Sequence, residues 1–85
     1  MTFTFEVLVS LKRGLSDPAG KAVMSALPAL GWTNVMSVHV GKHIELTVEA
    51  EGEADARAQV EEMARRLLSN PVIEDFRILD ASVEA

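Results

Sequence analysis

The chain has 85 residues, 48% of them hydrophobic, and a net charge of −5 from 13 acidic and 8 basic residues. This composition predicts one folded domain spanning residues 1–85, and the lack of cysteine excludes a disulfide framework and a thiolate metal site. The negative charge and the scattered basic residues argue against nucleic acid as a partner, and the short apolar runs argue against a membrane span.

Residues 2–12 alternate between apolar and polar side chains over five repeats, which predicts a half-buried β-strand. The apolar side chains that we expect on its buried face are Phe3, Phe5, Val7, Val9 and Leu11.

A helix is predicted to begin at Asp17-Pro18. The aspartate can accept hydrogen bonds from free N–H groups of the first turn, and proline loses nothing at the first helical position. We expect Pro28 to loosen the last turn and Gly31 to end the helix. The stripe that we expect to face the sheet consists of Ala19, Val23, Ala26, Leu27 and Leu30.

Two further strands are predicted in the middle of the chain, joined by a hairpin connection at Gly41-Lys42. The first covers residues 35–40 and the second follows the connection. The inward side chains of the second strand are expected to be Ile44, Leu46, Val48 and Ala50.

A second helix is predicted over residues 53–69, and Asn70-Pro71 should end it because proline keeps the preceding residue out of the helical region. A last strand is expected over residues 73–79. The buried stripe of the helix is expected to contain Ala56, Val60, Met63, Ala64, Leu67 and Leu68.

The predicted order is β-α-β-β-α-β, which indicates an α+β fold in two layers. We expect an antiparallel sheet with both helices on one face, a ferredoxin-like arrangement or a close variant. A core this small, without disulfides or metals, often gains support by oligomerising, so we expect an oligomer.

The sequence offers no catalytic constellation, cofactor site or metal site. The two histidines, His39 and His43, are expected to lie at the surface, and no carboxylate is spaced as an obvious third metal ligand. The outward positions of the strands carry no aromatic side chain on which RNA bases could stack. The N-terminus does not resemble a secretory signal, so we expect a cytoplasmic location.

Apolar side chains outside the predicted core indicate a surface that another protein covers. We expect Leu8 and Val35 on the sheet face without helices, Leu79 facing outward from the last strand, and Met24 at the helix margin. These four residues form the predicted oligomer interface.

Four segments of the chain, in this order, resemble the PurS family. They are residues 9–22, 30–32, 38–46 and 67–76, and together they cover nearly the whole chain. PurS is the small subunit of phosphoribosylformylglycinamidine (FGAM) synthase where that enzyme is divided among three polypeptides.

The resemblance implies a non-catalytic subunit in purine biosynthesis. The complex converts formylglycinamide ribonucleotide (FGAR) to FGAM with ATP, Mg²⁺ and glutamine, none of which this chain would bind. The small subunit would dimerise or form a tetramer, bridge the large synthetase subunit and the glutaminase subunit, and support ammonia transfer. Exposed groups near the motifs are candidate partner contacts: Lys12, Arg13, Lys42, His43, Asn70, Pro71, Val72, Ile73 and Glu74.

Two other functions remain open from the residues. An ACT-like regulatory domain has the same strand order and binds small molecules such as amino acids, and Gly14 lies in the first loop where such a domain needs a glycine. A small hydrolase of the acylphosphatase kind would need a longer glycine-rich loop than residues 12–14 provide.

Overall fold

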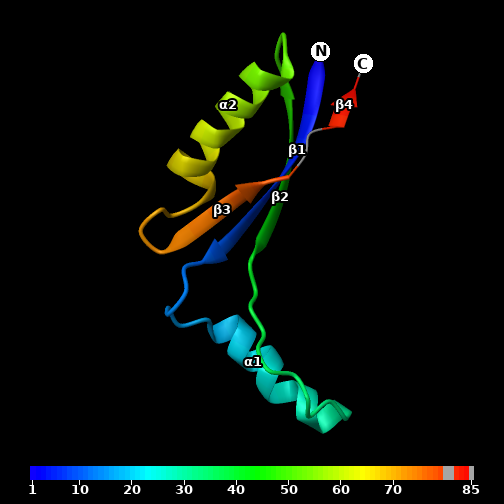
Figure 1. The fold of residues 1–85 in the computed structure, drawn as a ribbon, viewed down its shortest axis with the longest axis vertical. Helices are drawn as coiled ribbons and strands as arrows, with labels where there is room; N and C mark the ends of the chain where they lie inside the picture. The colour runs from blue at the N-terminus through cyan, green and yellow to red at the C-terminus, as the bar shows by residue number, and fades with distance from the viewer. Residues whose placement is uncertain (80–81, 85) are drawn as a thin grey trace.

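The computed structural model describes residues 1–79 and 82–84, which form a four-stranded antiparallel sheet, two α-helices and two short helical turns. In chain order the elements are β1 (Thr2–Leu11), α1 (Pro18–Ala26), the 3-10 turn η1 (Leu27–Leu30), β2 (Lys42–Glu49), α2 (Glu53–Met63), the π-helical turn η2 (Ala64–Leu68), β3 (Glu74–Ile78) and β4 (Ser82–Glu84). Figure 1 shows an elongated molecule, with the sheet and α2 in one half and α1 in the other. The predicted α+β class with an antiparallel sheet is confirmed.

β1 is the central strand, and all three other strands pair with it. β2 follows one edge of β1, from Thr2 opposite Glu49 to Val9 opposite Lys42. β3 and β4 share the other edge, with β3 beside the C-terminal half of β1 and β4 beside its first residues. The long alternating run of the sequence is therefore the strand on which the whole sheet is assembled.

The hydrophobic core lies between the sheet and α2. Figure 1 shows α2 alongside the sheet. The predicted inward face of β1 is confirmed, since Phe3, Phe5, Val7 and Val9 are at most 2% exposed. Ala56 and Val60 of α2 and Ala64 at the start of η2 are fully buried, and their short side chains let the helical region approach the sheet closely. The partly buried Ile44 and Leu46 of β2 pack against this cluster, as predicted.

The end of the second helix departs from the prediction. Ser69 donates its N–H to the carbonyl of Ala64, a five-residue spacing that belongs to a π-helical turn. The wider turn rotates the following side chains away from the α-helical stripe. As a result Leu67 is 82% exposed, so its predicted burial is wrong. The predicted burial of Met63 is also wrong, since this last residue of α2, which precedes the turn, is 37% exposed. The helical region ends before Asn70-Pro71, as predicted.

Residues 12–41, which we call the arm, leave the sheet after β1 and rejoin it at the same end, because Lys42 pairs with Val9. Figure 1 shows α1 beyond the end of the sheet, not against its face. The predicted placement of both helices on one face therefore holds for α2 and not for α1. The stripe of α1 is open to solvent instead: Val23 is 43% exposed and Leu30, in η1, is 69% exposed.

The predicted strand over residues 35–40 does not form, and the hairpin at Gly41-Lys42 is wrong. The outer edge of β2, with which the predicted hairpin would have paired this segment, has no paired strand among the described residues. Residues 32–40 return along α1, and a Cβ on Gly20 would lie 2.5 Å from the carbonyl oxygen of Val38. Gly20 therefore gives the helix a close approach to this returning segment.

The helix start and end inside the arm are confirmed. Pro18 occupies the first turn of α1, Pro28 coincides with the change to the 3-10 turn, and Gly31 ends the helix with a φ of 105°.

Asp17 joins the two chain segments at the root of the arm. Its Oδ1 accepts from the N–H of Gly20 at 2.8 Å and caps α1, while its Oδ2 accepts from the N–H of Val40 at 3.0 Å. These two hydrogen bonds, in that order, lower the pKa of the Asp17 carboxyl from its ordinary value of 3.8, and the charges of His39 and Lys21 add to the effect. One carboxylate therefore begins the helix and also fixes the returning strand-like segment.

Replacing Asp17 by asparagine should lower the melting temperature of the chain at neutral pH. The amide has one acceptor oxygen, so it can keep the bond to Gly20 or the bond to Val40 but not both. A carboxyl with a lowered pKa contributes stability above its unfolded pKa and loses it as the pH falls through the folded value. The difference in melting temperature between wild type and Asp17→Asn should therefore shrink below about pH 4. A difference that persists unchanged in acid would contradict the role of the ionised carboxylate.

Replacing Gly41 by alanine should destabilise the sheet, because the added Cβ would lie 2.5 Å from the carbonyl oxygen of Val9. We expect a loss of about 1–3 kcal/mol in the free energy of unfolding, measured by urea denaturation. Gly52→Ala is the control, since a Cβ there meets none of the described atoms within 4 Å. Equal losses in the two variants would show that the contact with Val9 does not restrict this position.

Candidate functional site

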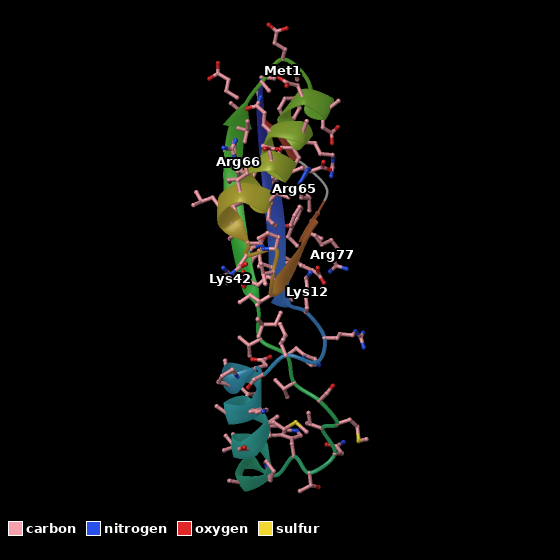
Figure 2. The ribbon with its side chains drawn as sticks, turned by 90° about the vertical axis from the view of Figure 1, so that its left-hand side faces the viewer. Met1, Lys12, Lys42, Arg65, Arg66 and Arg77 are labelled. Atoms are coloured by element: carbon pink, nitrogen blue, oxygen red, sulfur yellow. The ribbon has the colours of Figure 1, made fainter. Side chains whose placement is uncertain are left out.

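The predicted partner contacts come together at the end of the sheet from which the arm departs. Lys12 follows β1, Lys42 begins β2, and residues 70–74 form the turn that leads into β3 at Glu74. The backbone N–H of Lys12 donates to the carbonyl of Ile73 at 2.9 Å, which ties the turn to the end of the central strand. Figure 2 labels Lys12 and Lys42 at this end of the sheet.

The turn at residues 70–74 is ordered by its own side chains. Oδ1 of Asn70 accepts from the N–H of Val72 at 3.1 Å, and the N–H of Asn70 donates to Oε1 of Glu74 at 2.8 Å. The carbonyl of Asn70 also accepts from the N–H groups of Ile73 and Glu74. Pro71 is exposed, Val72 is 79% exposed and Ile73 is 40% exposed, so a fixed backbone presents apolar side chains to solvent.

Lys42 is already engaged within the chain. Its Nζ lies 3.7 Å from Oε2 of Glu74 and donates to the carbonyl of Leu68 at 3.4 Å. The side chain thus links β2 to the π-helical turn and to the start of β3. Because the Lys42 side chain is 57% exposed, its ion pair with Glu74 contributes little stability. The charge of Lys42 remains accessible at the surface.

His43 lies on the sheet face that has no helix. Its Nε2 is 3.1 Å from Oε1 of Glu6 on the neighbouring strand, and its side chain is 52% exposed. The same face carries Leu8, which lies between His43 and Arg77 and is half-buried. Leu79 donates its N–H to the carbonyl of Glu6, and it is half-buried while Phe76 packs against the core. His39 is 83% exposed, so the surface position predicted for both histidines is confirmed.

Val35 and Met24 lie elsewhere. Both belong to the arm, where each is half-buried, and Val35 is not on the sheet face on which the sequence placed it. The predicted oligomer interface therefore divides into two parts, one on the sheet with Leu8 and Leu79 and one on the arm.

A groove runs along the elbow between the sheet and the arm. It consists of two adjoining cavities of about 520 and 530 Å³ that share Ser10 and Asp75 in their walls. We call it the elbow groove. Its charged and titratable lining residues are Lys12, Arg13, Asp17, His39, Lys42, His43, Asp75 and Arg77.

Arg77 and Asp75 are charged lining residues of the groove that the sequence analysis did not single out. The signal was present in the alternation of the last strand, because Phe76 and Ile78 pack against the core and so place Arg77 on the opposite face.

Within residues 1–79 and 82–84, no group of three or more His, Cys, Asp or Glu side chains is arranged to hold a metal ion. Among the same residues, neither helix has the length and apolar character needed to cross a bilayer.

Comparison with known proteins agrees with the family expected from the motifs. The model of the PurS family, described as phosphoribosylformylglycinamidine (FGAM) synthase, matches residues 4–81. The FGAM synthase subunit PurS of Methanocaldococcus jannaschii is 40% identical over 78 residues, which are 92% of this chain and 94% of that protein.

Solved structures agree in fold over the same range. PurS of Thermus thermophilus has a TM-score of 0.89 at 33% identity, with complete coverage of both chains. A chain in the structure of PurLQS from Thermotoga maritima has a TM-score of 0.86 at 30% identity, covering 93% of this chain and 96% of that one. The chain described here therefore belongs to the PurS family of FGAM synthase subunits.

Proposed function

We propose that this chain is the non-catalytic small subunit of a cytoplasmic FGAM synthase complex in purine biosynthesis. It would bridge the large synthetase subunit and the glutaminase subunit. The observation that carries the proposal is the likeness to a chain of the Thermotoga maritima PurLQS structure over 93% of the residues.

The complex would use ATP, Mg²⁺ and glutamine to convert FGAR to FGAM, with these molecules bound by the other subunits. Ammonia released from glutamine is neutral and diffusible, and it protonates readily in water near pH 7. A subunit that orders the junction between the two active sites would reduce this loss without carrying out any bond chemistry.

The residues proposed to contact the other subunits lie around the arm-bearing end of the sheet. Lys12 and Arg13 follow β1, and the turn at residues 70–74 presents Val72 and Ile73 on a fixed backbone. Lys42 and His43 keep exposed side chains while paired with Glu74 and Glu6. Apolar side chains beside charged ones are common at the surfaces of subunits that associate.

Adding this chain to the other two subunits should raise glutamine-dependent FGAM formation at least tenfold, whereas the chain alone should form no FGAM and release no ammonia from glutamine. FGAM formation from added ammonium chloride is the control, because it bypasses the transfer between active sites and should change much less. Glutamine-dependent turnover that is equally fast without the chain would contradict the proposal.

We propose further that the chain associates with itself, as a dimer or tetramer. The arm supports this proposal, because Trp32 is 54% exposed and Met36 is 91% exposed on a segment that is held away from the core. Among the described residues, the outer edges of β2 and β3 have no paired strand. The strand-like alternation of residues 35–40 would suit pairing with another copy. The interface would include Met24 and Val35 on the arm and Leu8 and Leu79 on the sheet.

Size-exclusion chromatography with light scattering should give a mass that is two or four times 9.2 kDa. Replacing Met36 by glutamate should shift the chain towards the monomer, because a charge would have to lose its water in the interface. Ser37→Glu adds the same charge at an exposed polar neighbour and should have a smaller effect. A wild-type chain that elutes as a monomer would contradict self-association.

A further inference from the structure

The cations of this chain divide into two groups according to their partners. On α2 and η2, Arg57, Arg65 and Arg66 each lie 3.6–3.8 Å from a glutamate four residues earlier. Lys42 lies beside Glu74. Among the described residues, by contrast, Lys12, Arg13 and Arg77 have no ion pair with a carboxylate, and the same is true of Lys21 on α1.

Three of these four free cations line one surface. Lys12 and Arg13 line the first cavity of the elbow groove, and Arg77 lines the second. Figure 2 labels Lys12 and Arg77 near the end of the sheet where the arm begins. Lys42 also lines the second cavity but is paired with Glu74, so the groove has three unpaired permanent cations against the two carboxylates of Asp17 and Asp75. A locally positive groove on a chain of net charge −5 is the opposite of what the overall composition predicts.

The two carboxylates in the groove are not equivalent. Asp17 is satisfied by the N–H groups of Gly20 and Val40, and its side chain is only 15% exposed. Asp75 is exposed, and it lies where the two cavities meet. An occupant of the groove therefore meets cations at both ends and one carboxylate in the middle.

We propose that the elbow groove docks an extended acidic segment of a partner subunit. Acidic side chains of the segment would lie against Lys12 and Arg13 at one end and against Arg77 at the other. A neutral or hydrogen-bond-donating residue would lie between them, opposite Asp75. The joined, open shape of the two cavities suits a chain that runs through both of them. Leu8 also lines the second cavity, so this segment and a second copy of the chain would compete for that part of the sheet. This inference rests on the proposed function, since it names the chemistry of the subunit contact.

The test is a triple variant, Lys12→Gln with Arg13→Gln and Arg77→Gln. All three side chains are exposed and make no ion pair among the described residues, so the fold should be kept. The matched control is Lys21→Gln with Arg65→Gln and Arg66→Gln, which removes the same number of positive charges outside the groove. Binding of each chain to the other FGAM synthase subunits is measured by calorimetry at 50 and 300 mM salt.

We expect the groove variant to lose about tenfold in affinity at 50 mM salt and to lose much of its salt dependence, because exposed charge pairs weaken as ions screen them. The control should bind within about twofold of wild type. Equal affinity of the groove variant and wild type would overturn the docking surface, as would an equal loss in the control. If the wild-type chain does not bind the other subunits, that result contradicts the proposed function as well as the docking surface.

The nature of the occupant is tested on the isolated chain by NMR. A peptide of sequence Glu-Asp-Gly-Asp-Glu should shift the amide signals of Lys12, Arg13 and Arg77, and its Gln and Asn counterpart should not. Shifts caused by inorganic pyrophosphate without any shift from the acidic peptide would overturn the proposal in favour of a small phosphate ligand.

Discussion

The arrangement of the molecule depends on the contacts of one carboxylate. Asp17 holds the first turn of α1 and the backbone of Val40 at the same time, so the outgoing and returning parts of the arm meet at its two oxygens. The sheet needs no such device, because β1 is paired on both edges and covered by α2. Without Asp17, the two parts of the arm would lose both of these hydrogen bonds, while the close approach of Gly20 to Val38 would remain.

What the sequence predicts well is what depends on near neighbours in the chain. The alternation of residues 2–12 fixes which side chains of β1 are buried, and Asp17-Pro18 and Asn70-Pro71 mark a helix start and a helix end. Each of these patterns acts through contacts a few residues apart. The antiparallel sheet and the α+β class follow from these local patterns and are confirmed.

The features that the sequence did not predict depend on contacts between segments that are far apart in the chain, or on a change of helix type. The alternation of residues 35–40 resembles that of a buried strand, but nothing within it indicates that the segment lies beside α1 in the arm instead of pairing with β2. Likewise, the apolar stripe of α1 predicts that another surface covers the helix, but it does not indicate whether that surface belongs to the same chain. The π-helical turn changes the phase of the second helix, and so the exposure of Leu67 could not be read from a 3.6-residue period.

The candidate site shows the same division. The exposed groups Lys12 and Arg13 and the turn at residues 70–74 were identified from the sequence, and the structure brings them to one end of the sheet. That Lys42 and His43 are paired with glutamates, while Arg77 is not, required the strand register. The register also places Arg77 in the same groove as Lys12 and Arg13, which no spacing in the sequence could indicate.

The arm is, in topological terms, a long insertion in the hairpin formed by β1 and β2. Because both of its ends lie at the Val9–Lys42 pair, a change in its length would leave the register of that hairpin and the packing of α2 unaltered. Relatives could therefore gain or lose residues there and alter how far the protein reaches towards its neighbours, while the scaffold that carries it stays the same.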